Sequence, residues 1–165
     1  MPRARNRTGA RGATVGQQVT ARLFVVCDYA AVSPDGKLHI MGANIDQMFL
    51  REFPGPVGQA YLAALLSVPW NETSEQHSLR IRLLDSDRNP VGLDPLLEAQ
   101  AEIGRPPGAR PGDAFGLPVA VPFGGIEINA EVSAYFHLEV DDRAVASHPF
   151  RFRLALPGML PPAPK

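Results

Sequence analysis

Hydrophobic and polar residues alternate along much of this chain, most clearly between residues 77 and 84. There Leu79, Ile81 and Leu83 occupy every second position, with arginine between them. Successive side chains of a strand point to opposite faces, so this pattern predicts a half-buried strand with one face toward solvent. A similar alternation over residues 134–140 predicts a second strand of the same kind.

A β-hairpin is predicted where two apolar runs flank a short turn. The run 24–32 is apolar at almost every position, which indicates that other layers cover both of its faces. Residues 33–36 are Ser-Pro-Asp-Gly, which favours a type I turn closed by a glycine bulge. Residues 37–49 form the expected returning strand, with a bend or bulge at Gly42.

Further short strands are expected near residues 59–68, 96–103, 117–121 and 126–128, with proline- and glycine-rich turns between them. Alanine and leucine in the first of these runs would also allow a helix, but Pro69 ends it at a length typical of strands. The second run is compatible with a weak strand or a short helix.

In the last predicted strand, the apolar residues shift from odd-numbered to even-numbered positions. Val145 lies at an odd position, whereas Phe150 and Phe152 lie at even ones, although all three are apolar. Because side chains alternate strictly along a strand, the change requires one extra residue. We place this bulge near residues 148–149, where a proline is tolerated.

These elements predict an all-β protein of seven or eight short strands. We expect a two-sheet antiparallel sandwich of immunoglobulin-like or Greek-key type, with a partly closed barrel as the alternative. Seventeen prolines fit this class, because proline opposes long helices. We assign residues 19–156 to the sandwich, 1–18 to a disordered basic arm and 157–165 to a proline-rich tail.

Charge and cysteine content narrow the functional classes. The net charge is −1, yet Arg3, Arg5, Arg7 and Arg11 crowd the first eleven residues, so the rest of the chain is mildly acidic. Cys27 is the sole cysteine, which excludes an internal disulfide and a thiolate zinc site. Because no apolar run has the length of a membrane span or a secretory signal, we expect a cytoplasmic protein without a membrane segment.

An aspartate-rich turn is a candidate calcium site. Asp85, Asp87 and Asn89 have the spacing that opens a calcium-binding loop. Pro90 and Leu96 occupy the places where the helix–loop–helix motif needs glycine and glutamate. We therefore predict a polar turn held by side-chain-to-backbone hydrogen bonds.

Two histidines flank the last predicted hairpin. A two- or four-residue turn would place His137 and His148 on the same outer face, close enough for a metal or a pH-sensitive pair. The sequence shows no third ligand, and a bulge would turn His148 away. We expect both to be ordinary polar residues and predict no metal or cofactor.

Asp28 is an acid inside an apolar run. A buried carboxylate is costly unless it is paired or hydrogen-bonded. We expect it to bond to neighbouring backbone and fix the strand register, with a tuned acid or base as the alternative. His39 could approach Asp28 across the hairpin, in a register that the sequence leaves open.

Two pairs of arginines are candidates for binding an anion or an acidic partner. Arg80 and Arg82 share one strand face, and Arg151 and Arg153 share another. If the two strands were neighbours, these residues would form a basic patch. The acidic body and the lack of interleaved exposed aromatics argue against nucleic-acid binding except through the arginine-rich arm.

Residues 27–42, CDYAAVSPDGKLHIMG, together with 77–83 and 138–145, resemble an uncharacterised family of small bacterial β-sandwich proteins, a domain of unknown function. The resemblance covers about residues 20–155. It implies the fold class and supplies no catalytic residues to transfer. Such proteins often have glycine where this chain has Asp142.

A well-patterned core without a catalytic motif predicts a non-enzymatic binding or scaffolding module. Its loops or an exposed sheet edge would engage a protein partner, for instance by strand addition. A sugar- or anion-binding sandwich that uses the loop 105–113 or the arginine faces is the alternative. A hydrolase or isomerase centred on Asp28 and His39 is the third hypothesis.

Overall fold

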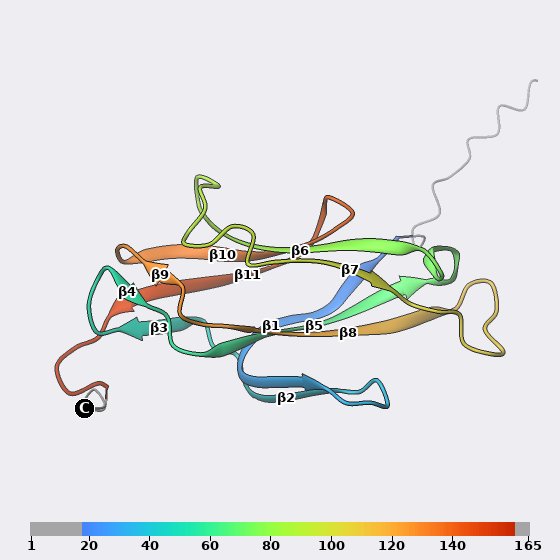
Figure 1. The fold of residues 1–165 in the computed structure, drawn as a ribbon, viewed down its shortest axis with the longest axis horizontal. Helices are drawn as coiled ribbons and strands as arrows, with labels where there is room; N and C mark the ends of the chain where they lie inside the picture. Colours follow the sequence, from blue (N-terminus) through green and yellow to red (C-terminus); the bar gives the residue numbers. More distant parts are fainter. Residues whose placement is uncertain (1–17, 161–165) are drawn as a thin grey trace, which may run out of the picture.

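The structure, a computed structural model, describes residues 18–160 and is built almost entirely from β-strands (Figure 1). Residues 1–17 and 161–165, and with them most of the expected arm and the end of the tail, lie outside the described residues. One 3-10 turn, η1 (Trp70–Glu72), accompanies the strands. The strands are β1 (Thr20–Val32), β2 (Leu38–Ala43), β3 (Gln47–Leu50), β4 (Gly55–Pro56), β5 (Ala60–Pro69), β6 (Gln76–Asp85), β7 (Leu97–Glu102), β8 (Ala114–Phe123), β9 (Glu127–Ile128), β10 (Val132–Val140) and β11 (Arg143–Leu154).

Two larger sheets face each other across the core (Figure 1). One has the order β2-β1-β5-β8 and the other the order β3-β11-β10-β6-β7, while β4 and β9 form a small third sheet. The predicted all-β class is confirmed. The expectation of purely antiparallel sheets is wrong at one pair, because β3 runs parallel to β11. This pairing arises because the predicted single strand 37–49 crosses between the sheets at residues 44–46.

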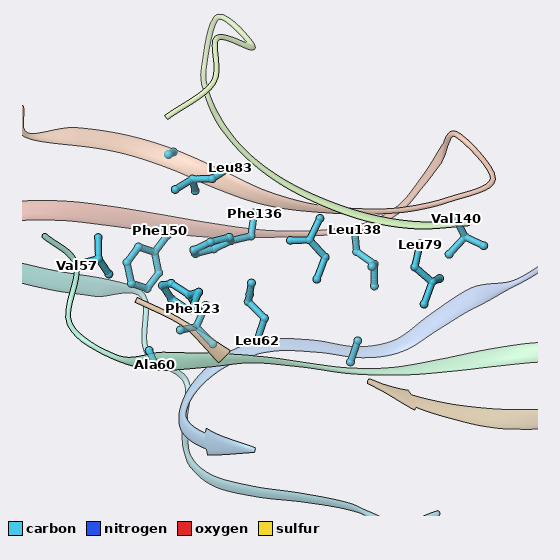
Figure 2. Close-up of a cluster of buried hydrophobic side chains, with 14 of the residues drawn as sticks. Val57, Ala60, Leu62, Leu79, Leu83, Phe123, Phe136, Leu138, Val140 and Phe150 are labelled. Carbon is cyan, nitrogen blue, oxygen red and sulfur yellow. The ribbon is translucent and has the colours of Figure 1, made fainter. Parts of the chain in front are cut away.

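The core lies between the inner faces of the two sheets (Figure 2). Phe136 of β10 is fully buried, and its ring centroid lies 5.2 Å from that of Phe123 and 5.3 Å from that of Phe150. The alternating residues Leu79 and Leu83 of β6 point into this core, as predicted. Burial of such apolar side chains, at about 25 cal/mol per Å² of apolar surface, is the main favourable contribution to folding.

The middle of β1, around Val26 and Cys27, is covered on both faces, as its apolar run predicted, whereas Asp28, Tyr29 and Val32 further along are exposed. Val26 is buried in the main core, whereas its neighbour Cys27 is buried on the other side with Ala63. Leu38 and Ile40 of β2 pack against that second cluster. The end of β1 and all of β2 therefore bend away from the layer of β5 and β8 and lie outside it (Figure 1).

The predicted extra residue of the last strand exists at a different place. Leu138 of β10 faces Ala146, but the next residue of β10 faces Ala144, which leaves Val145 without a partner. The expected bulge at residues 148–149 is therefore wrong in position. The two-residue turn pairs Val140 with Arg143, and the strand takes up its extra residue only two positions after Arg143.

Candidate functional site

The turn between β1 and β2 has the predicted hairpin geometry. The Gly36 amide donates to the Ser33 carbonyl at 2.8 Å, and the Ser33 amide donates to the Lys37 carbonyl at 2.9 Å. Gly36 has a φ of +77°, which a residue without a side chain adopts at little cost. This three-residue loop sets the register of the hairpin, in which Val32 faces Leu38.

Strand β2 ends its sheet, so among residues 18–160 no strand pairs with its other edge. In an antiparallel pair, every second residue of a strand bonds to its neighbour, and the residues between point their N–H and C=O groups away. Since Ser33 and Lys37 form the first bonded pair, the outward-pointing residues of β2 are Leu38, Ile40 and Gly42. Their backbone groups face solvent and form an edge open to another strand.

Exposed apolar side chains lie beside this open edge. Met41 is 66% exposed and faces Tyr29, which is 45% exposed. The Tyr29 ring meets Tyr61 edge-on with the centroids 5.1 Å apart, so it is held in place and not free to collapse inward. Val32, opposite Leu38, adds an exposed apolar side chain near the tip, on the other face of the hairpin. Clustered exposed apolar surface is typical of interaction sites.

Asp28 sits on this hairpin, not in the interior. Its side chain is exposed and lies over Gly42, where any side chain would overlap the carboxylate and where φ is +62°. The expected buried carboxylate is therefore wrong, because β1 bends out of its sheet at this point. His39 faces Ala31, which puts it on the opposite face of the hairpin from Asp28. The two residues do not form an acid–base pair.

The other three sheet edges carry features that hinder strand addition. β8 contains Pro118 and Pro122, which have no N–H to donate. β7 carries Glu98 and Glu102, and β3 is only four residues long. β2 has neither proline nor charged residues and is six residues long. Of the four ends of the two larger sheets, it is the one without such protection.

A second polar site, which we call the His77 cluster, joins the turn of β10 and β11 to η1. It consists of His77, Asp141, Ser78 and the carbonyl of Glu72. The His77 ring is only 4% exposed, with Nδ1 2.7 Å from Asp141 Oδ2 and Nε2 2.9 Å from the Glu72 carbonyl oxygen. The Ser78 amide donates to Asp141 Oδ1 at 2.9 Å. Both ring nitrogens thus meet acceptors.

This arrangement favours a protonated His77. Burial opposes the charge, but the hydrogen bonds to Asp141 and to the Glu72 carbonyl outweigh it and raise the pKa of His77 above 6.5. Burial would raise the pKa of Asp141, yet the bonds from His77 and Ser78 lower it. An Asp–His pair can orient a catalytic base, but here no ring nitrogen is left for a substrate. The cluster is a structural clamp.

The His77 cluster also holds a strained turn and the start of β1. Asp141 and Asp142 have φ values of 51° and 59°, which a two-residue hairpin turn of this hand requires. The Glu72 carboxylate accepts a hydrogen bond from the Val19 amide at 3.1 Å, and Arg143 donates to the Val19 carbonyl at 2.6 Å. Sequence reasoning missed this site because its members are 64 residues apart and only strand register joins them.

The predicted basic patch is not formed. Strand β10 lies between β6, which carries Arg80 and Arg82, and β11, which carries Arg151 and Arg153. The patch required β6 and β11 to be neighbours, so this part of the hypothesis is wrong.

Acidic partners hold most of these guanidinium groups. Arg82 donates twice to Asp94, at 2.8 and 2.7 Å, and Arg80 donates to Glu98 and Asp142.

On β11, Arg151 is paired with Asp46, and Arg153 donates to the Ser133 hydroxyl. The charges on the two strands are thus locally engaged, and they do not converge on one anion position.

The histidine pair that the turn length alone would have placed on one face is not formed, since a bulge turns His148 away. His137 lies opposite Arg82 on the outer face, whereas His148 lies opposite the buried Phe136. The unpaired residue Val145 separates the two histidines, because one extra residue moves every later side chain of β11 to the opposite face of the sheet. His148 Nε2 lies 3.0 Å from the carbonyl oxygen of Ile45. Within residues 18–160, no group of three or more acidic, histidine or cysteine side chains gathers as a metal site would require.

The turn 85–89 has the predicted polar structure. Asp85 Oδ1 accepts the amides of Asp87 and Asn89 at 2.9 and 2.8 Å, which is the expected side-chain-to-backbone pattern. In the loop 105–113, Arg105 stacks over the Trp70 ring at 3.9 Å and donates to Thr73. That arginine is therefore part of the local packing.

A half-open hollow of about 430 Å³ lies beside β3. Its wall is mainly apolar and includes Phe49, Pro56 and Leu160, with Arg51 and Glu52 at its border. A sugar or an anion needs several converging polar groups, which an apolar wall does not supply.

Taken together, the described residues define an all-β protein whose two larger sheets face each other and whose sheet edge β2 is open. A family model described as a family of unknown function, DUF6941, matches residues 22–153, and the chain belongs to this family. The resemblance inferred from the sequence is confirmed to that extent. Comparison with curated proteins gives no match. No helix within residues 18–160 is long and apolar enough to cross a membrane.

Proposed function

We propose that this protein is a non-enzymatic binding module that takes up an extended strand of a protein partner along β2. The unprotected β2 edge, set against three protected edges, is the observation that carries the proposal. An added strand would pair with the outward backbone groups of Leu38 and Ile40. Its alternate side chains would contact Met41, and Tyr29 lies beside Met41 on the same face and supports it.

Other features support the same class. The one close Asp–His pair is fully engaged in the His77 cluster, so it offers no base for catalysis. Cys27 is buried, and burial raises the pKa of its thiol, which suits an unreactive cysteine in a reducing cytoplasm. We also assign the body to the immunoglobulin-like or Greek-key sandwiches, since β6 and β10 are neighbours although β7, β8 and β9 lie between them in the chain.

Photo-crosslinking followed by a peptide experiment tests the proposal. Benzoylphenylalanine replaces Met41 in the full chain, which is then irradiated in native extract, and the crosslinked segment is identified by mass spectrometry. The matched control carries the same group at Leu93, an apolar residue of similar exposure, 59%, away from the hairpin. We expect the group at position 41 to crosslink one segment reproducibly. The group at position 93 should not crosslink that segment.

The captured segment is then synthesised and added to the purified chain. Strand addition protects the outward amides of Leu38 and Ile40 from hydrogen exchange, because those amides gain acceptors. We expect this protection in the native chain and in Leu93→Lys, and its loss in Met41→Lys. Binding that leaves both amides unprotected, or equal crosslinking at positions 41 and 93, would overturn the proposal.

A further inference from the structure

We infer that a second copy of this chain occupies the β2 edge and pairs with it antiparallel about a twofold axis at Ile40. The inference rests on the proposed function and names its partner. Three features of β2 support the inference. They are the positions of the residues whose backbone groups point outward, the absence of charge, and the position of the hairpin outside the body.

The phase of the outward backbone groups fits self-pairing. Leu38, Ile40 and Gly42 point their N–H and C=O groups away from β1. With the axis at Ile40, Leu38 faces Gly42 of the other copy, Ile40 faces its own counterpart, and Gly42 faces Leu38. All three outward residues then meet outward residues. A shift of the axis by one residue leaves only two such pairs.

The side chains are also compatible with self-pairing. On the exposed face, His39 of one copy lies opposite Met41 of the other, and each Met41 stays beside its own Tyr29. The two Met41 side chains then lie diagonally across the axis, each packed against His39 of the other copy. A twofold axis brings each charged side chain near its own counterpart, so like charges would oppose pairing. β2 has no lysine, arginine, aspartate or glutamate.

The hairpin is placed so that two copies can meet. β2 and the end of β1 lie outside the layer of β5 and β8 (Figure 1). Pairing would join two four-stranded sheets into one of eight strands. Two six-residue strands make a contact at or below the roughly 1,200 Å² that marks weak interfaces, so the dimer should dissociate on dilution.

Sedimentation velocity over a concentration series tests the inference on the purified full chain. We expect a monomer–dimer equilibrium that Met41→Lys weakens by roughly tenfold or more, because the packing of Met41 on His39 of the other copy is lost and the two introduced charges lie diagonally across the axis. Leu93→Lys adds the same charge to a site of similar exposure and should leave the equilibrium unchanged.

Cysteine crosslinking tests the register. In the double variant His39→Cys/Met41→Cys, mild oxidation should join position 39 of one copy to position 41 of the other. His39→Cys alone reports an axis at residue 39, and Met41→Cys alone reports an axis at residue 41. Cys27 is fully buried and does not compete. We expect the 39–41 product to dominate, as mapped by mass spectrometry.

The outcomes separate this inference from the proposed function. A chain that stays monomeric at every concentration, or a dimer indifferent to Met41→Lys, overturns the second copy as partner. The proposed function still stands in that case if a different protein protects the amides of Leu38 and Ile40. If neither self-association nor any strand protects them, both statements fail.

Discussion

The β2 edge and the His77 cluster differ in whether their polar groups have hydrogen-bond partners within the protein. At the His77 cluster, a nearly buried imidazole has an acceptor at each nitrogen. At the β2 edge, the outward groups of Leu38 and Ile40 are left to solvent beside an exposed methionine. The cluster has the more suggestive chemistry, yet the edge is where we propose that a partner binds.

The difference follows from the cost of desolvation. A buried polar group without a partner costs about 1–3 kcal/mol, so the interior satisfies its own groups and leaves nothing for a ligand. A solvent-exposed polar group forms a hydrogen bond with water. It can exchange this bond for a hydrogen bond with a partner at little net cost in free energy. A perturbed pKa such as that of His77 therefore marks a structural clamp here, although such shifts also mark active sites.

Removing Asp141 should have the largest effect on stability. Asp141→Ala leaves the buried His77 with one acceptor and the Ser78 amide without its partner. We expect a loss of about 2 kcal/mol, below the cost of stranding a fully buried charge, because Asp141 is half exposed. Urea unfolding measures it at neutral pH.

The neighbouring residue of the same turn provides a matched control. Asp142 also has a positive φ, but its carboxylate meets only the partly exposed Arg80. Asp142→Ala should therefore cost clearly less than Asp141→Ala. Equal losses would mean that turn strain, and not the bond to His77, is what Asp141 contributes.

Two glycine substitutions should sharpen the account of the hairpin. Gly42→Ala adds both a strained φ and an overlap with Asp28, whereas Gly36→Ala adds strain with open space around it. We expect losses of about 2 kcal/mol and about 1 kcal/mol in the free energy of unfolding. The double variant Gly42→Ala/Asp28→Ala removes the carboxylate but keeps the Cβ of residue 28 at 3.0 Å, so it should recover part of the loss and remain below Gly36→Ala in stability. If it stays at the level of Gly42→Ala, the overlap is not the cause.

The pH dependence of stability should show the smallest effect. The pKa of His77 is raised, so its contribution is complete below about 6.5 and is lost as the pH rises through the folded value. The pKa of Asp141 is lowered, so its contribution is complete above about 3.8 and is lost as the pH falls through the folded value. Urea unfolding should show the alkaline loss in the native chain. His77→Gln should lack it, and an identical pH profile would contradict the role assigned to His77.

Local patterns predicted the elements better than their partners. Alternation at Leu79 and Leu83 located β6, and the turn residues before Gly36 located the first hairpin, because both signals act within a few residues. The parity change in the last strand correctly required an extra residue. Its position at Val145 depended on the turn at Asp141, and the two histidines were misplaced for the same reason.

The sequence predicted a docking edge but did not identify the strand that forms it. Sequence reasoning expected an exposed sheet edge, but strand order decides which strand is an edge. That order puts β10 between the two arginine-bearing strands and puts β2 at the end of its sheet. The bend of β1 exposed Asp28, which an apolar run had suggested to be buried.

By itself, the sequence determined that the chain forms short strands, where the first hairpin turns, and that the middle of the first strand is covered on both faces. These follow from side-chain alternation and from the dihedral preferences of proline and glycine, which are local. Only the tertiary structure decided which strands are neighbours, which edge stays open and which histidine has a raised pKa. Those outcomes depend on contacts between residues far apart in the chain, and a one-residue shift in register reverses them.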